Sequence, residues 1–572
     1  MNAGIRREVT GRELGLLVAG ACLLSIVMHW PLILHLGETV PRDIGDPLPQ
    51  AWQAAWDGHA LAHQPLDLFQ ANQFWPFRDT LAFSDALVGY APAGLVGSGP
   101  HAAVVRYDLL FLFAYALAFV GAYLLARELG VGPWGAVVAG AAFAFAPFRL
   151  EQDGHLQVIS SGGIPLALAL AVRGARRASP GAMVAAWLVA AWQVSIGFSL
   201  GLPFMYLLLA LAAIGAVVWG RRGRPPPPRR MLLATAAGAL VFVACVGLLS
   251  RPYERVADRF SQATRSPGTV AGYSGPPQVF LVAPEENLIW GPATAGLRDD
   301  LSSIPEKTLF PGLLILGLAV AGVRWGGWPR RLGWSLAAAA LAISILALGF
   351  REPGGLLWPD RIAYELLPGW QGIRTPGRLV TFSSLALALL AAGGTERLIA
   401  ALRRSGRRPV VIAAAAPVLA LAVLIEGRGL PFDPTDSQAQ PAVPGIPPSV
   451  ASVPAPQLHL PARRPEDNRR YLLWSTDGFP KLVNGRSSTL PPFTDRLIGE
   501  MGTFPDAASV AELRRLGVAS VIIHLDRVRG TAQEAAASQP IAGLGISRRR
   551  EGPLEIYDVR SPSANSAVAV EP

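Results

Sequence analysis

Long apolar runs recur along most of the chain and define its architecture. The first three extend from Leu14 to Leu36, from Leu109 to Ala126 and from Trp134 to Pro147, and others follow as far as Ile425. Because a helix needs roughly 20 apolar residues to cross the hydrocarbon core of a bilayer, each run predicts a membrane-spanning segment. The pattern therefore predicts an α-helical polytopic membrane protein with about 11 transmembrane helices between residues 14 and 425.

Arginine clusters between the runs predict the orientation of these helices. Arg6, Arg7 and Arg12 precede the first run, so the N-terminal residues 1–13 are predicted to be cytoplasmic. Alternation then places every arginine-dense short loop on the cytoplasmic side, including RRGRPPPPRR at 221–230.

The same alternation places two long loops, at about 37–105 and 250–306, outside the cytoplasm. The apolar stretch Ala86 to Val96 in the first of them is short and contains Pro92. We therefore expect it to form a re-entrant or surface helix rather than a span.

Hydropathy falls after Ile425. A segment rich in Pro and Ala at 426–466 predicts a semi-extended linker, and residues 467–560 predict a small extracytoplasmic α/β domain. Within it, Tyr471 to Trp474 and Val518 to Leu525 are predicted strands. Asp506 to Leu516 is a predicted helix that Gly517 ends. Residues 561–572 are expected to be a flexible tail.

Composition removes several classes of protein. A chain that is 51% hydrophobic and 16% charged does not fit an ordinary soluble enzyme. The net charge of +10 comes from arginines in short clusters rather than along one face, so it reflects membrane topology and not nucleic-acid binding. Cys22 and Cys245 both fall in predicted spans, so neither a disulfide framework nor a zinc site is expected. The abundance of Arg, Ala, Gly and Pro favours a bacterial source.

Polar residues near the spans gather at one end. A charge at the centre of a membrane helix costs about 2.5 to 3.5 kcal/mol, so such residues need a reason. Those at predicted outer ends or in outer loops are Asp46, Arg106, Asp108, Arg149, Asp153, His155, Gln157, Gln193, Arg251, Arg374 and Arg378. They predict a functional site on the outer face at the membrane boundary.

Several of these residues have two interpretations. Asp46 precedes Pro47, which is the pattern of a helix N-cap, so it is either a cap or a chemically active acid. His155 is either a structural histidine at the interface or a ligand. Arg374 and Arg378, in IRTPGR, either bind a phosphate near a helix start or anchor the helix in the headgroups.

Signals for a metal or a cofactor are weak. Asp43 and Asp46 are closely spaced carboxylates, but they lack the accompanying His or Glu of a strong metal site. There is no phosphate-cradling loop, no HExxH and no nucleophilic serine motif. No cofactor is therefore predicted, and a divalent metal is not indicated.

Seven segments in order resemble a known family. They are a Gly-Asp pair soon after the first span, NQFWPFRDTLAFSD (72–85), AFAFAPFRLEQDGHLQV (142–158), RPYERV (251–256), EKTLFPG (306–312), LPGWQGIRTPGR (367–378) and RRYLLWSTDGFPKLVNGRSSTLPP (469–492). Together they resemble bacterial YfhO-like and related polytopic proteins of the GT-C glycosyltransferase superfamily.

This resemblance implies a function and a set of site residues. Members of the superfamily transfer a sugar from a polyprenyl-phosphate donor to an acceptor on the outer face of the membrane. It implies an inverting displacement with Asp46 as general base and Asp43 as the reserve candidate. The residues it implies for substrate binding are Arg149, His155, Gln157, Arg251, Tyr253, Arg374 and Arg378, with Arg374, Arg378 and Arg251 on the donor phosphate.

The expected partners are the polyprenyl-phosphate sugar donor, an envelope glycan, lipid or protein acceptor, and the lipid bilayer, with no nucleic acid. The expected location is the bacterial cytoplasmic membrane. Two other functions remain open. A flippase or transporter of lipid-linked saccharides should carry polar groups through the bilayer midplane, where this chain has few. A non-catalytic envelope assembly protein predicts that no single acid matters.

Overall fold

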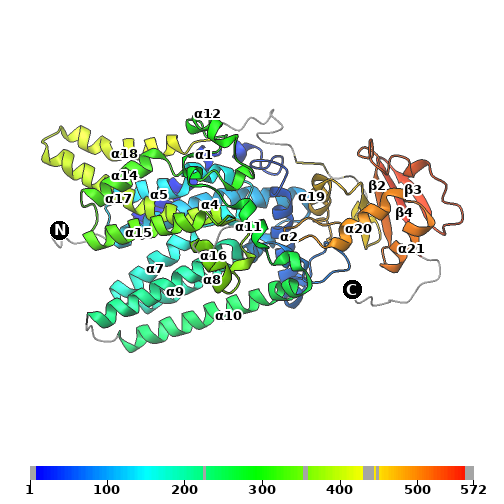
Figure 1. Ribbon diagram of the computed structural model, residues 1–572, viewed down its shortest axis with the longest axis horizontal. Helices are drawn as coiled ribbons and strands as arrows, with labels where there is room; N and C mark the ends of the chain where they lie inside the picture. Colours follow the sequence, from blue (N-terminus) through cyan, green and yellow to red (C-terminus); the bar gives the residue numbers. More distant parts are fainter. Residues whose placement is uncertain are drawn as a thin grey trace. The chain divides into compact units, whose positions relative to one another are not determined.

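The computed structural model describes residues 8–222, 227–351, 358–429, 443–445, 447 and 450–560. The tail expected at 561–572 lies outside these ranges, as does most of the stretch 430–449 in the expected linker. The chain divides into two compact units, and each is described by itself (Figure 1). Unit 1 comprises Met1–Ile33, Leu110–Leu249 and Thr264–Phe432. Unit 2 comprises Leu34–Leu109, Ser250–Ala263 and Asp433–Pro572.

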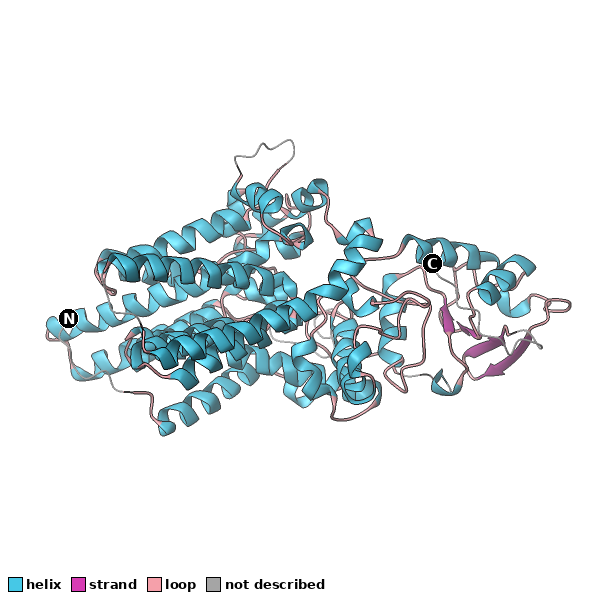
Figure 2. Cartoon of the chain, turned by 90° about the horizontal axis from the view of Figure 1, so that it is seen from below, coloured by secondary structure: helices cyan, strands magenta, loops and turns pink. Residues whose placement is uncertain are grey.

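Helices account for nearly all of the regular structure in unit 1 (Figure 2). The long ones are α1 (Gly11–Met28), α4 (Gly99–Leu129), α5 (Pro133–Ala144), α7 (Gly163–Arg177), α8 (Pro180–Ile196), α9 (Phe198–Arg221), α10 (Arg229–Arg259), α14 (Leu313–Arg324), α15 (Arg330–Ala347), α17 (Val380–Arg404) and α18 (Pro409–Glu426). The shorter ones are α6 (Leu156–Ile159), α11 (Pro267–Tyr273), α12 (Trp290–Ala293), α13 (Ala295–Arg298) and α16 (Pro359–Leu366). Helices α4 and α10 contribute residues to both units.

The helices match the predicted spans. Within the described residues, eight are long and apolar enough to cross a membrane, counting α6 and α7 as one, and α5, α8 and α14 are shorter apolar helices. The prediction of a multi-pass helical membrane protein with about 11 spans is confirmed. The stretch Ala86 to Val96 forms only η4 (Val88–Tyr90) and α3 (Ala91–Gly94), which are far too short to cross.

Helix α17 lies at the centre of unit 1, because α5, α14 and α15 all pack against it. Small residues allow these helices to approach closely, as is typical of membrane helix pairs. A Cβ added to Gly322 of α14 would lie 2.2 Å from the Leu390 carbonyl oxygen of α17, and one added to Gly394 would lie 2.0 Å from the Leu318 oxygen. The spacing of α14 and α17 therefore requires glycine at these positions.

We predict that Gly322→Ala destabilises unit 1 by about 1 to 3 kcal/mol, because the helices must separate to admit the methyl group. Gly317 offers a matched control on the same helix, since a Cβ added there would meet nothing within 4 Å. Gly317→Ala should leave stability unchanged or raise it slightly through helix propensity. Thermal unfolding of the two variants in detergent tests this, and equal melting temperatures would contradict it.

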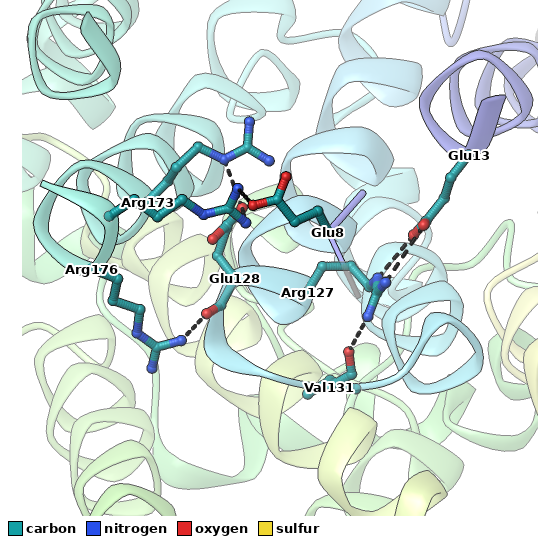
Figure 3. A network of polar contacts seen from close by, with 8 residues as sticks. Glu8, Glu13, Arg127, Glu128, Val131, Arg173 and Arg176 are labelled. Atoms are coloured by element: carbon teal, nitrogen blue, oxygen red, sulfur yellow. Dashed lines mark hydrogen bonds and ion pairs between the residues drawn. The ribbon is translucent and has the colours of Figure 1, made fainter. Parts of the chain in front are cut away.

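Arginines at one end of unit 1 are held by acids (Figure 3). Arg127 donates to Glu13 across 2.9 Å, and the Tyr123 hydroxyl donates to the same carboxylate across 2.7 Å. Arg173 donates to Glu128 across 2.7 Å. These bonds join α1, α4 and α7 at their ends, where basic loops are predicted.

Unit 2 contains a four-stranded sheet with the order β1-β2-β4-β3, and the strands (magenta) gather there in Figure 2. The strands are β1 (Gln457–Leu460), β2 (Ser520–His524), β3 (Ser547–Glu551) and β4 (Leu554–Asp558). Strand β1 is parallel to β2, and the other pairs are antiparallel. Residues 457–460 fall within the predicted linker, whereas Leu458 and Leu460 are buried in the core beneath the sheet.

The remaining helices of unit 2 are α2 (Pro47–His63), α3, α19 (Pro465–Trp474), α20 (Pro492–Glu500) and α21 (Ala507–Arg515). Helix α21 confirms its prediction. Asp506 and Ser509 form a reciprocal capping box at its start, and Gly517 has a left-handed φ of 70° just after its end. The predicted strand at Val518 to Leu525 is also confirmed, as β2.

The predicted strand at Tyr471 to Trp474 is wrong, because these residues end helix α19. Pro465 at the first helical position and two acids in the first turn favour a helix start there. All four residues from Tyr471 to Trp474 are buried, and α19 packs on α2 while its aromatic rings contact the sheet. A short apolar run buried on both sides has no periodicity that separates strand from helix.

Two histidines are buried between the sheet and α19. His459 Nδ1 lies 3.0 Å from His524 Nε2, and the rings of Tyr471 and Trp474 lie against His524 with centroids 4.9 and 5.2 Å away. Burial lowers the pKa of His459 to about 3. Burial also lowers the pKa of His524, and the nearby charges of His459 and Arg527 lower it further. Both histidines are therefore neutral in the folded domain.

We predict that this pair makes the sheet less stable in acid. The folded pKa values lie below the ordinary histidine value of about 6.5, so the unfolded chain binds protons more readily than the folded one. The sheet is therefore most stable above that pH and loses stability as the pH falls below it. Hydrogen exchange in β2, corrected for intrinsic rates, should accelerate between about pH 7 and pH 5. The double variant His459→Asn, His524→Asn should lose this dependence. Protection of β2 that does not vary with pH in the wild type would contradict the prediction.

Candidate functional site

Unit 1 brings three of the sequence-predicted site residues together around an acid. Arg378 lies in the turn η10 (Pro376–Leu379) just before α17, and its Nε donates to both carboxylate oxygens of Glu306 across 3.2 Å. Both side chains are less than a tenth exposed. A bidentate pair of this kind has a fixed geometry, so Glu306 determines where the Arg378 guanidinium lies.

The charges of His155 and Arg374 also act on Glu306. Burial alone would raise the pKa of Glu306, but the charge and hydrogen bonds of Arg378, together with the charges of His155 and Arg374, lower it below its ordinary value. Arg374 is half-buried, and its guanidinium lies over the Tyr273 ring, 5.0 Å from the centroid. His155 precedes the short helix α6, and Gln157 lies within it, both half-buried. Arg374 is therefore the more accessible of the two arginines.

Arg149 has a structural environment. It lies in the turn η5 (Pro147–Gln152) and is 2% exposed. Its guanidinium donates to the Ile159 carbonyl across 2.7 Å and to the Ser161 hydroxyl across 3.0 Å, and it lies over the Tyr115 ring. These contacts fix the connection between α5 and α7, so Arg149 shapes the position of His155 and Gln157.

We predict that Glu306→Gln destabilises unit 1 strongly, because Arg378 would remain buried without its counter-charge. Breaking one side of a buried ion pair costs about 3 to 5 kcal/mol. In the wild type the folded pKa of Glu306 lies below the ordinary value of about 4.3, so the contribution of the pair is complete above that pH and is lost as the pH falls through the lower folded value.

Melting temperatures measured in detergent from neutral pH to about pH 3 test this prediction. Glu306→Gln should melt well below the wild type at neutral pH and show a flatter acid limb. The double variant Glu306→Gln, Arg378→Met should recover part of the loss, because it removes the unpaired charge. A wild-type melting temperature for the single variant would show that the pair carries no stability.

Asp46 lies in unit 2 at the start of α2, but its side chain makes no capping hydrogen bond. The cap position itself is occupied as predicted, since the Asp46 carbonyl accepts the Gln50 N–H across 3.1 Å. The carboxylate instead lies 3.5 Å from the guanidinium of Arg469 and is 47% exposed. Asp43 accepts the Gly45 N–H across 2.6 Å in a local turn.

Sequence reasoning missed Arg469. It lies on α19, which packs against α2, and its Nη1 is 3.8 Å from Glu466 on the same helix. The only signal in the sequence was its place at the head of the segment RRYLLWSTDGFP, which the family resemblance already singled out. The C-terminal part of the chain thus supplies a cation directly to the acid that follows the first span.

The other two predicted residues of unit 2 lie near the end of α10. Arg251 is exposed, and the Tyr253 hydroxyl donates to the Ser84 carbonyl across 3.0 Å. Arg255, which is not among the residues predicted from the sequence, binds Asp79 through two hydrogen bonds of 2.7 and 3.0 Å. Tyr253 and Arg255 therefore hold the loop 72–85 in place.

A second acid on α2 is a poor candidate base. Asp57 is fully buried, and neither carboxylate oxygen has a hydrogen-bond partner within the described part of the chain. Burial raises its pKa well above the ordinary value, which disfavours the charged form that a general base needs. Of the two, Asp46 has the accessible carboxylate, with a side chain that is 47% exposed.

No metal site is apparent among the residues that the structure describes. There, no three side chains of His, Cys, Asp or Glu come together as ligands would. Glu306 and Asp46 are instead paired with arginines, an arrangement in which the arginine stabilises the charged carboxylate.

Comparison with known proteins identifies the fold. No protein-family profile and no curated protein matches the sequence. Two cryo-EM classes of a mutant of the arabinofuranosyltransferase AftD from Mycobacteria have TM-scores of 0.52 and 0.51 at 17% identity. The match covers 97% of this chain and 42% of AftD, so the chain spans less than half of that protein's length.

A weaker likeness, with a TM-score of 0.45 at 14% identity, is to ArnT from Cupriavidus metallidurans bound to undecaprenyl phosphate. It covers 97% of this chain and 99% of that one, but its score is too low to carry an argument. The likeness to AftD shows that the chain has the fold that the resemblance to the GT-C superfamily implied, and it shows the fold alone. Membership of the YfhO-like subfamily stays a prediction.

Proposed function

We propose that this protein is a membrane glycosyltransferase that uses a polyprenyl-phosphate-linked sugar and transfers it to an envelope glycan, lipid or protein. The fold shared with AftD supports the class of membrane glycosyltransferases only by analogy. The function of a protein depends on its site, so the argument must come from the site residues. The observation that carries the proposal is the state of Asp46. Its carboxylate makes no capping hydrogen bond to α2, lies 3.5 Å from the Arg469 guanidinium and is 47% exposed, so an acceptor in solvent can reach it.

In the proposed reaction Asp46 takes the proton of the acceptor hydroxyl as its oxygen attacks the anomeric carbon. The bond from that carbon to the phosphate oxygen breaks on the opposite side, which inverts the configuration and releases the polyprenyl phosphate. Proton transfer requires the carboxylate within about 2.6 to 3.2 Å of the attacking oxygen. Asp43 is the weaker candidate, because it already accepts a local backbone hydrogen bond. The proposed reaction uses no metal.

The proposal assigns the donor phosphate first to Arg374. Arg378 is neutralised by Glu306, so we assign it the task of positioning the turn before α17. Arg251, which is exposed, remains a second candidate for the phosphate. His155 and Gln157 are proposed to orient the sugar. Arg149 holds the connection on which they lie, and Tyr253 holds the loop 72–85.

We predict that Asp46→Asn abolishes transfer while leaving the protein folded. Asparagine fits the start of α2 as well as aspartate does, but it cannot accept a proton at neutral pH. In the native host, mass spectrometry of envelope glycans should show the profile of a deletion strain at normal membrane levels of the variant. Asp43→Asn is the matched control and should retain transfer. A wild-type glycan profile for Asp46→Asn would exclude Asp46 as the base.

A further inference from the structure

Unit 2 contains a cavity of about 370 Å³ along the second half of α2. His59 and His63 of α2, Arg106 of α4, and Leu95, Thr476 and Phe479 are among the residues that line it, and none of the described lining residues is an acid. The wall is therefore part apolar and part basic. Asp57, a neighbour of this part of α2, is buried away from the cavity.

The two histidines form a stacked pair in the lining of the cavity. Their rings stack with centroids 4.6 Å apart, and the His59 ring also lies 4.6 Å from that of Phe479. The Nδ1 of His63 donates to the His59 carbonyl oxygen across 2.8 Å. This bond fixes the orientation of the His63 ring and leaves its Nε2 for another contact.

Arg106 supplies a second and independent feature. It is only 6% exposed, and three backbone carbonyls hold it, including Ala93 at 2.9 Å from Nε and Gly97 at 3.0 Å from Nη2. Its Nη1 is buried and has no hydrogen-bond partner among the described residues. Because the buried guanidinium of Arg106 lines the cavity and has no carboxylate partner among its described contacts, an anion bound there would compensate its charge.

The start of α4 adds a further positive element. Gly99, its first residue, lines the cavity. The first turn of a helix has N–H groups without intrahelical partners, and it carries a partial positive charge that favours anions. Guanidinium, imidazole and a helix start thus converge on one space that has no compensating carboxylate.

We propose that this cavity binds a phosphate group. Phosphate oxygens accept several charge-assisted hydrogen bonds at once, which matches the donors present. The cavity is distinct from the proposed catalytic acid, because His59 lies roughly 20 Å along α2 from Asp46 at 1.5 Å per residue. The phosphate comes either from a lipid headgroup or from a soluble phosphate, and the apolar wall of Leu95 and Phe479 is compatible with both.

The test is binding to the purified full chain in detergent by isothermal titration calorimetry. Two probes are used: inorganic phosphate and dihexanoyl phosphatidic acid, with dihexanoyl phosphatidylcholine as the control lipid. Arg106→Gln removes the unpaired N–H, and the double variant His59→Gln, His63→Gln removes the imidazoles without touching the carbonyl contacts of Arg106. Arg496→Gln, on the exposed face of α20, is the control for net charge.

We expect saturable binding of at least one probe, weakened about tenfold or more in each cavity variant and unchanged in Arg496→Gln. Tighter binding of phosphatidic acid than of phosphate identifies a lipid headgroup, and the reverse identifies a soluble phosphate. Absence of saturable binding, or wild-type affinity in the histidine variant, overturns the proposal. Asp46→Asn should bind like the wild type, so this result and the test of transferase activity can fail separately.

Discussion

The structure depends on one constraint, which is that hydrocarbon supplies no partner for a polar group. Every backbone N–H and C=O of a span must be satisfied within its own helix, and charged side chains must leave the span or pair. The acids and arginines of unit 1 follow this rule. Glu13 and Arg127 pair at helix ends, and Glu426 accepts the N–H groups of Leu313 and Leu314, which begin α14. Where no side chain fits, as at Gly322, glycine allows the backbones to meet.

The spans could be predicted because hydropathy is a local property, and so is the capping box of Asp506 and Ser509. The error at Tyr471 to Trp474 has a different origin. Four buried residues in succession carry no period, and their conformation depends on the sheet and α2, which lie far away in the sequence. Strand β1 was missed for the same reason, since Leu458 and Leu460 are buried only once β2 lies beside them.

In the candidate site, too, features set by neighbouring residues were predicted, and contacts between residues far apart in the sequence were not. Asp46 and the arginines of IRTPGR were found because each lies within two residues of a proline near a helix start. Their partners were not found, because Glu306 precedes Arg378 by 72 residues and Arg469 is supplied by the C-terminal part of the chain. A sequence indicates which groups are charged, but only the fold decides which charges are already neutralised.

The two ion pairs differ in how far they are buried, and they are therefore suited to different roles. The pair of Glu306 and Arg378 is almost fully buried, so separating its charges leaves one of them unpaired in a medium of low dielectric. The pair of Asp46 and Arg469 is different, because the Asp46 side chain is 47% exposed and lies 3.5 Å from the arginine. An exposed ion pair of this kind contributes only about 0 to 1 kcal/mol to stability. Arg378 is therefore suited to hold a turn in place, whereas Asp46 is suited to exchange partners, which is what a general base must do.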